Sequence, residues 1–125
     1  LYQNKAFILV NTHLICFASN KARIRQINTI TEVLSHDSLK TPTIILGDFN
    51  YSSLRNKRLL ELMKLYQFQN GTDKLLTHKL FMFTSLLTHQ VDYIFSKLCM
   101  VKNTTVMKKI TYSDHYPIHF TLELY

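Results

Sequence analysis

The chain has 125 residues, 46% of them hydrophobic, which is enough for one domain with a buried core. Lys and Arg total 15 against 8 Asp and Glu, and the formal net charge of +7 favours a polyanionic partner or an anionic membrane surface. No apolar stretch approaches the length of a membrane helix and no repeat is present, which excludes a helical membrane span and a repeat array. The positive residues form small separate groups, so charge alone is weak support for a nucleic-acid partner.

The first predicted elements are a strand, a helix and a second strand. The apolar run from Ala6 to Val10 predicts a strand, buried on both faces, that delivers His13 at its end. Ser19 or Asn20 can cap the helix that follows. Its inner face has apolar or small residues at helical spacing: Ile24, Ile27, Ile30, Thr31, Val33 and Leu34. The apolar run from Thr43 to Leu46 predicts the second strand, which such a unit usually places parallel to the first.

The tetrapeptide Gly47-Asp48-Phe49-Asn50 follows this strand. The glycine lets the backbone turn, so that an Asp and an Asn two residues apart leave the strand end side by side. The Asp carboxylate supplies a hard oxygen for Mg²⁺, and the Asn amide can contact another oxygen without adding negative charge. A turn held by Asx hydrogen bonds is the structural alternative.

In the second half of the chain, apolar and polar residues alternate less regularly. Ser52 or Ser53 can cap a helix that reaches about Tyr66, and Asn70-Gly71 indicates a turn. The helix has its apolar residues on one side: Leu59, Leu62, Met63 and Tyr66. A short strand and loop are predicted at Phe81 to Leu87. Further strands are predicted at Val91 to Phe95, at Thr104 to Ile110 and, with clear alternation, at Ile118 to Leu124.

Two more polar sites, one single residue and one pair, lie beside these strands. Asp92 follows Val91 at the start of one strand, and Asp114-His115 precede the last strand. A carboxylate on one ring nitrogen of a histidine fixes its tautomer and raises the basicity of the other nitrogen, so Asp92 and His115 can form a general base. For Asp114-His115 the structural alternative is a helix cap or a loop bridge.

The remaining chemistry-bearing residues give no firm pattern. His36, His78 and His119 are interpreted as surface or strand-face residues, and His89 as a loop residue that could also face a substrate. A zinc site from His13, His89 and His115 lacks a spacing signature. Cys16 and Cys99 are interpreted as buried thiols, with a disulfide left open. Four aromatic residues are assigned to core packing rather than to base stacking: Tyr93, Phe95, Tyr116 and Phe120.

In this order the four polar segments resemble the endonuclease/exonuclease/phosphatase superfamily of metal-dependent phosphoesterases. The segments are Asn11-Thr12-His13-Leu14, Gly47-Asp48-Phe49-Asn50, Val91-Asp92-Tyr93-Ile94-Phe95 and Ser113-Asp114-His115-Tyr116-Pro117-Ile118. The resemblance runs from about Phe7 to Leu124 and implies an α/β fold, the four-layer α/β/β/α sandwich of the deoxyribonuclease-like type. It also implies that residues 1–125 are the C-terminal half of one such domain, which would pair with an N-terminal half that carries a metal-binding Glu and an Asn.

The resemblance further implies a phosphodiesterase that uses Mg²⁺ or Mn²⁺ and attack by water. Asp48 and Asn50 would hold the water and the scissile phosphate, while Asp48 and Asp114 would contribute to metal binding. His115 would be the general base and Asp92 its hydrogen-bond partner. His13 occupies the place of a residue that contacts phosphate or assists the leaving group.

The substrate is left open by the sequence. Nucleic acid is favoured because of the basic charge, with sphingomyelin, another phospholipid or a small phosphate ester as alternatives. Inositol-polyphosphate phosphatases usually carry Trp-Cys-Asp-Arg where this chain has His89-Gln90-Val91-Asp92, and abasic-site endonucleases usually carry Leu in place of Phe49, so both subfamilies are weaker matches. The localisation stays open.

A non-catalytic remnant that binds nucleic acid or a protein partner is the alternative class of function. In either case we expect the sheet that contains Ile118 to Leu124 to face its own helices on one side and a second sheet, absent from this chain, on the other. A chain expressed alone would then expose apolar surface, associate with itself and lack hydrolase activity.

Overall fold

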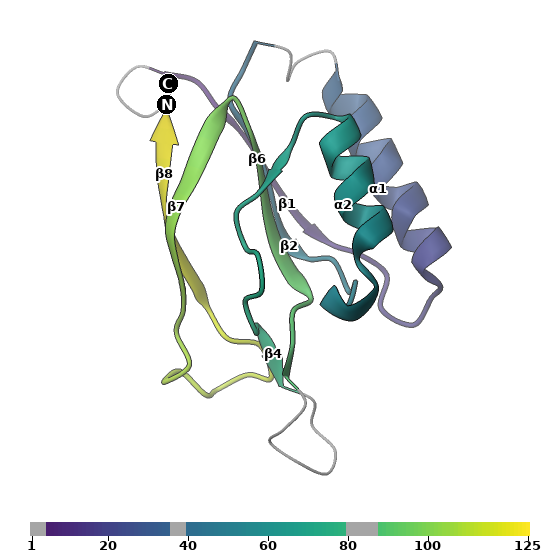
Figure 1. Cartoon of the computed structure of the whole chain (residues 1–125), viewed down its shortest axis with the longest axis vertical. Helices are drawn as coiled ribbons and strands as arrows, with labels where there is room; N and C mark the ends of the chain where they lie inside the picture. Colours follow the sequence, from purple (N-terminus) through teal and green to yellow (C-terminus); the bar gives the residue numbers. More distant parts are fainter. Residues whose placement is uncertain (1–4, 36–39, 80–87) are drawn as a thin grey trace.

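The computed structural model describes residues 5–35, 40–79 and 88–125, which form packed layers of sheets and helices. A four-stranded sheet has the order β1-β2-β6-β3. Its strands are β1 (Ile8–His13), β2 (Thr43–Asp48), β6 (Asp92–Lys97) and β3 (Gln69–Asn70). Two helices, α1 (Asn20–Ser35) and α2 (Lys57–Leu65), cover one face of this sheet (Figure 1). The chain therefore has the predicted mixed α/β architecture.

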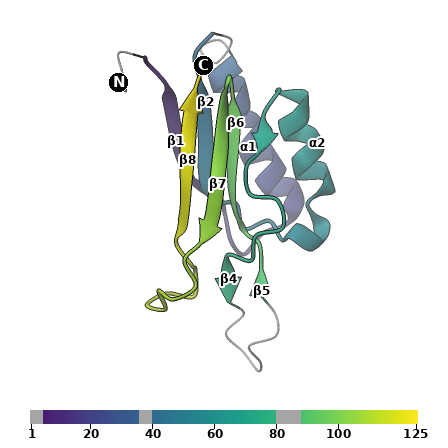
Figure 2. The ribbon, with the colours of Figure 1, turned by 60° about the vertical axis from the view of Figure 1, so that its left-hand side comes forward.

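A second sheet covers the opposite face. It is formed by β7 (Cys99–Val106) and β8 (Ile118–Leu124), which pair antiparallel and lie in front of the larger sheet in Figure 2. A short antiparallel pair, β4 (His78–Lys79) and β5 (Thr88–His89), lies at one end of the two sheets. No helix in the described ranges is long and apolar enough to cross a membrane.

The strand-helix-strand unit at the start of the chain has the predicted topology, because β1 and β2 are parallel neighbours. β1 is an edge strand, however, and its residues alternate in burial, with Leu9 56% exposed. The prediction of a strand buried on both faces was therefore wrong: an apolar run does not show whether another layer covers both faces of a strand.

The main core lies between the sheet and the helices. Phe49, Tyr93 and Phe95 are almost completely buried, and Phe49 meets both other rings edge to face at centroid distances of 5.6 and 5.4 Å. Ile27 of α1 and Met63 of α2 pack into the same cluster. Burial of each such side chain stabilises the fold by roughly 1.5–3 kcal/mol. The core assignment of Tyr93 and Phe95 is confirmed.

A second core lies between the two sheets and corrects one prediction. Ile44, Ile94 and Cys99 are buried there against alternate residues of β8: Ile118, Phe120, Leu122 and Leu124. The chain thus contains strands of both sheets, and the apolar face of β8 packs against the first sheet rather than against helices. Period-two alternation shows that a strand has one apolar face, but not which layer covers it.

Element boundaries differ in two places. The strand predicted at Thr104 to Ile110 ends at Val106 and begins earlier, at Cys99, because pairing with β8 defines its limits. Asn103 has a positive φ of 51° within the irregular stretch of this pairing. The helix predicted from Ser52 to Tyr66 is divided into a 3-10 turn (Ser53–Arg55) and α2, with Ser52 capping the turn.

The remaining local predictions have mixed outcomes. Ser19 accepts a hydrogen bond from the Ala22 backbone at the start of α1, as a cap would. Cys99 is buried, but Cys16 is exposed in the loop after β1, and both thiols are free. The predicted element at 81–87 and His36 lie outside the described residues.

Candidate active site

Strand register places three of the predicted residues in one row. His13 of β1 is the partner of Asp48 of β2, and Asp48 is the partner of Asp92 of β6. Side chains of directly paired residues lie on the same face of a sheet. The ladder therefore brings these three residues together from three separate chain segments. His13 Nε2 lies 3.5 Å from Asp48 Oδ2.

The turn after β2 orients Asp48 and Asn50. Gly47 has a φ of 129°, and a Cβ there would lie 2.0 Å from the Thr12 carbonyl oxygen, so this position requires glycine. The Asn50 backbone N–H donates to Asp48 Oδ1 at 2.7 Å, and Asn50 Nδ2 donates to the Leu14 carbonyl at 2.8 Å. The Asx turn is thus present. It also leaves Asp48 Oδ2 and the Asn50 amide oxygen without a backbone donor in this turn.

Asp92 and His115 form a close pair. His115 Nδ1 lies 2.9 Å from Asp92 Oδ2 and 3.1 Å from Asp92 Oδ1. An ionised Asp92 accepts a hydrogen bond from Nδ1–H, and in this tautomer the lone pair is on Nε2. Nε2 in turn lies 3.8 Å from Asp48 Oδ2. The structure therefore connects His115 to the row formed by the strands.

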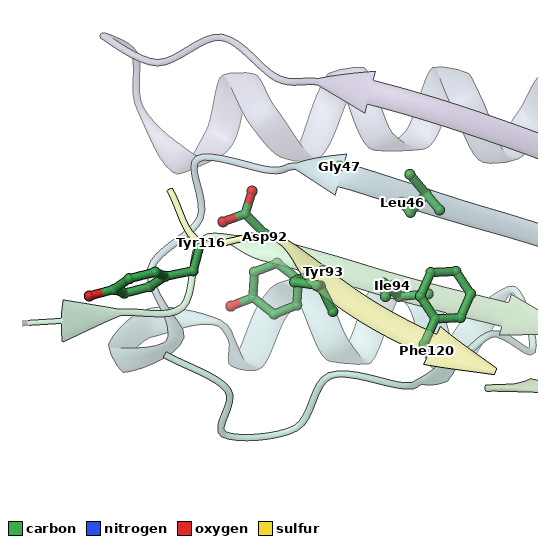
Figure 3. Close-up of a pocket in the computed structure, with 8 residues that line it drawn as sticks. Leu46, Gly47, Asp92, Tyr93, Ile94, Tyr116 and Phe120 are labelled. Carbon is green, nitrogen blue, oxygen red and sulfur yellow. The ribbon is translucent and has the colours of Figure 1, made fainter. Parts of the chain in front are cut away.

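The surroundings of Asp92 favour a stable orientation of this pair. Asp92 belongs to the lining of a cleft of about 190 Å³ between the two sheets, together with residues such as Leu46, Tyr93 and Tyr116 (Figure 3). Its side chain is only 17% exposed, against 32% for His115. A hydrogen bond to a carboxylate is stronger in such apolar surroundings than in water.

Asp114 is exposed and bonded differently. Ser113 Oγ donates to Asp114 Oδ1 at 3.2 Å, and His78 Nε2 lies 3.5 Å from Asp114 Oδ2. Slight burial raises the pKa of this carboxyl, but the Ser113 hydrogen bond, its own backbone N–H and the nearby His115 and His78 together hold the pKa below its usual value. Asp114 is therefore ionised at neutral pH and available to a cation.

His78 is a site residue that sequence reasoning missed. It was interpreted as a surface or strand-face residue, but it forms an antiparallel bridge with His115, and the two ring centroids are 4.6 Å apart. Its side chain is 21% exposed, and its Nδ1 is buried with no hydrogen-bond partner. No local pattern marks this residue, because the bridge joins segments far apart in the sequence.

Thr77 is a second residue that the sequence did not indicate. It is fully buried, and its Oγ1 accepts hydrogen bonds from the backbone N–H groups of Val91 and Asp92 at 3.3 and 3.2 Å. Its carbonyl accepts from the Tyr116 N–H at 2.8 Å. Thr77 therefore links the segments that carry Asp92 and His115.

Two other histidine predictions have clear outcomes. His89 was interpreted as a loop residue, but it lies in β5 and pairs with His78. His119 is exposed on β8, as a strand-face residue should be. Within the described ranges, the group of three side chains close enough to share a metal is His78, Asp114 and His115, so the combination of His13, His89 and His115 does not form a zinc site.

The oxygen donors suit a hard divalent cation. Mg²⁺ takes oxygen ligands, keeps several waters and is commonly held by one or two carboxylates together with substrate phosphate. Asp48 Oδ2 and the amide oxygen of Asn50 are donors of this kind. Their chemistry fits Mg²⁺ or Mn²⁺ as part of a metal shell.

Comparison with known proteins supports the fold. No protein-family model and no curated protein matches the sequence. Among solved structures, a conserved protein of unknown function from Enterococcus faecalis V583 aligns with a TM-score of 0.79 and 25% identity over 99% of this chain and 52% of that chain. An endonuclease/exonuclease/phosphatase family protein from Bacteroides thetaiotaomicron aligns with a TM-score of 0.74 and 22% identity, over 98% and 52% of the two chains.

A mannosyl-6-phosphatase from Bacteroides thetaiotaomicron VPI-5482 gives a TM-score of 0.72 and 20% identity, over 96% of this chain and 52% of that chain. The chain therefore has the deoxyribonuclease-like fold of endonuclease/exonuclease/phosphatase proteins. It spans about half the length of these similar structures.

Proposed function

We propose that the full-length protein hydrolyses a phosphate ester by direct attack of water, with Mg²⁺ or Mn²⁺ as cofactor. The observation that carries this proposal is the Asp92-His115 pair, with His115 Nε2 3.8 Å from Asp48 Oδ2. A histidine oriented by a carboxylate, next to a second carboxylate at a strand end, suits a reaction that needs a general base beside a metal.

The proposed roles follow from the contacts. His115 Nε2 accepts a proton from the attacking water, and Asp92 stabilises the imidazolium that forms. Asn50 and Asp48 position the water and the phosphate, because their free oxygens lie at the turn held by the Leu14 and Asn50 hydrogen bonds. A divalent cation held by Asp48 and Asp114 would neutralise charge on the phosphoryl oxygens.

His13 and Asp114 are assigned supporting roles. His13, with its side chain 72% exposed beside Asp48, is proposed to contact the phosphate or to protonate the leaving oxygen. Asp114, ionised and 51% exposed, contributes negative charge for the cation. Asp48 is the other proposed metal ligand.

Nucleic acid is the favoured substrate. The net charge of +7 attracts a polyanion more strongly than it attracts a neutral or singly charged ester. The alternatives are a sphingomyelin-type phospholipid and a sugar phosphate, since one structurally similar protein is a mannosyl-6-phosphatase. A non-catalytic protein that only binds nucleic acid or a partner is the alternative from another class.

The test is a hydrolysis panel on the full-length protein. DNA, RNA, sphingomyelin and mannose 6-phosphate are incubated with Mg²⁺ or Mn²⁺ and with chelator. We expect metal-dependent cleavage of nucleic acid. Turnover of the lipid or sugar phosphate alone would overturn the substrate assignment, and absence of all hydrolysis would favour the non-catalytic alternative.

Variants of the pair test the mechanism. His115→Ala should lower kcat at least about a hundredfold, and Asp92→Asn should act through the same step, so the double variant should be little worse than His115→Ala. His119→Ala, on the exposed face of β8, and Asp73→Asn, 72% exposed, are the matched controls. Multiplicative losses in the double variant would give Asp92 a separate role.

A further inference from the structure

Two imidazoles, one of them the proposed base His115, lie close to one carboxylate. His78, Asp114 and His115 each offer one ligand atom, and these three atoms lie within 4.8 Å of one another. His78 Nε2 and Asp114 Oδ2 are separated by 3.5 Å, close to the spacing of two ligands on one metal ion. Binding of one ion would require the three ligand atoms to move closer together by side-chain rotation.

The backbone already holds the two contributing segments together. The Lys79 N–H donates to the Asp114 carbonyl and the Tyr116 N–H donates to the Thr77 carbonyl, both at 2.8 Å, on either side of the His78-His115 bridge. The ligand side chains are 21%, 51% and 32% exposed for His78, Asp114 and His115. The cluster is therefore preorganised and open to solvent.

The contact between Asp92 and His115 also favours metal binding. Metal-ligating histidines commonly donate their other ring N–H to a carboxylate, which fixes the ring and raises the basicity of the ligating nitrogen. Asp92 provides this contact at Nδ1, 2.9 Å away, and leaves Nε2 of His115 as the ligand.

The donor types select the metal. Mg²⁺ prefers oxygen ligands, whereas imidazole nitrogen suits Zn²⁺ and other late transition metals. Asp48 and Asn50 offer oxygen, but His78 and His115 offer nitrogen. The two sets of donors at this end of the sheets therefore differ in the ions that they favour.

We propose that His78, Asp114 and His115 form a metal site of the Zn²⁺ class, which shares Asp114 with the proposed Mg²⁺ shell, and that its occupation inhibits hydrolysis. A metal on His115 Nε2 uses the lone pair that the proposed base needs to accept a proton, so the loaded protein cannot activate water through this residue. The binding part stands on the geometry alone, and the inhibitory part rests on the proposed function.

Binding is tested on the full-length protein, stripped of metal, in millimolar Mg²⁺. Zn²⁺ binding is measured by calorimetry, and Co²⁺, added alone, reports the site by its visible absorption. We expect one tight Zn²⁺ per chain. His78→Phe, which keeps a ring against His115, and Asp114→Asn should each weaken Zn²⁺ binding about tenfold or more, since loss of even an outer-shell partner costs 10–100-fold.

Two further variants separate this site from other histidines. His119→Ala should leave Zn²⁺ affinity unchanged, because that residue lies on the exposed face of β8. His13→Ala should also retain Zn²⁺ binding. Loss of Zn²⁺ binding in this variant would move the site to the His13-Asp48 contact and overturn the proposal. Unchanged affinity in both His78→Phe and Asp114→Asn, with circular dichroism and melting like wild type, would overturn it as well.

Inhibition is a separate measurement. Zn²⁺ is titrated into the Mg²⁺-dependent assay, and the half-inhibiting concentration should rise about tenfold or more in His78→Phe, in step with its binding loss. Zn²⁺ binding without inhibition, or with activation, would overturn the inhibitory part. A protein that binds Zn²⁺ as expected but hydrolyses nothing would retain the site and refute the proposed function instead.

Discussion

Replacing Gly47 by Ala should destabilise the protein strongly, and more than the same change at Gly71. The position has a φ of 129°, which an L side chain rarely adopts, and the added Cβ would lie 2.0 Å from the Thr12 carbonyl oxygen. A strained backbone conformation of this kind costs about 1–3 kcal/mol. The clash adds to this cost, because the 2.0 Å separation must grow by about 1.4 Å to reach ordinary van der Waals contact at 3.4 Å.

The atom that a Cβ at position 47 would meet is the backbone oxygen of Thr12, so side-chain rotation cannot remove the clash. Thr12 is the register partner of Gly47 in the β1-β2 ladder, so movement of its carbonyl would disturb the neighbouring pairs, including His13 and Asp48. We expect a total loss of about 4 kcal/mol or more in the free energy of unfolding. That is a large share of the 5–15 kcal/mol typical of a folded protein.

Urea unfolding of wild type and variants measures the loss in the free energy of unfolding. Second substitutions that remove a clashing group serve as tests of rescue. At Gly71 an added Cβ would meet Val101 side-chain atoms at 2.7 and 2.8 Å, so Gly71→Ala should cost about 1–3 kcal/mol and Val101→Ala should relieve the clash. Asn11→Ala removes only the 3.0 Å contact of the Asn11 amide oxygen with a Cβ at Gly47 and should not rescue Gly47→Ala. A loss below about 1 kcal/mol, or full rescue by Asn11→Ala, would refute the backbone argument.

Two further predictions concern buried polar groups. Burial raises the pKa of Tyr93 to about 12, with a smaller opposing effect from the Asn56 hydrogen bond. The folded state therefore keeps the phenol proton more tightly than the unfolded state does. This contribution to the free energy of unfolding is complete below pH 10 and is lost as the pH rises from 10 to 12. Two pKa units correspond to about 2–3 kcal/mol, and urea unfolding at several alkaline pH values should show that Tyr93→Phe removes most of this loss; an unchanged pH slope would contradict the assignment. Gln90 is 1% exposed and its Nε2 donates to the Thr72 carbonyl at 2.6 Å. Gln90→Leu should therefore lower the free energy of unfolding by about 1–3 kcal/mol, and a neutral result would mean that water replaces the lost donor.

Local chemistry explains which parts of the fold were predictable. Gly47-Asp48-Phe49-Asn50 combines a buried strand, a turn residue and two polar groups, so its role in the turn could be predicted from four residues. The alternation at Ile118 to Leu124 similarly defined β8. Both signals depend only on neighbours in sequence.

The predictions that failed concern residues whose partners are distant in sequence. The prediction at Thr104 to Ile110 missed the start of β7 because the polar residues of this strand face solvent and its limits depend on pairing with β8. The place of His78 in the candidate site was not predicted for the same reason, since only the bridge to His115 brings it there. A single sequence contains no direct signal for such a contact.

The row of His13, Asp48 and Asp92 limits how a protein of this architecture can vary in length. Side chains alternate along a strand, so one residue inserted within β1, β2 or β6 would turn a functional group to the opposite face, and two would displace it by about 7 Å. Segments between the strands carry no such restriction. Diversification by insertion is therefore expected in the connections, where new substrate contacts can be added while the central ladder keeps its length.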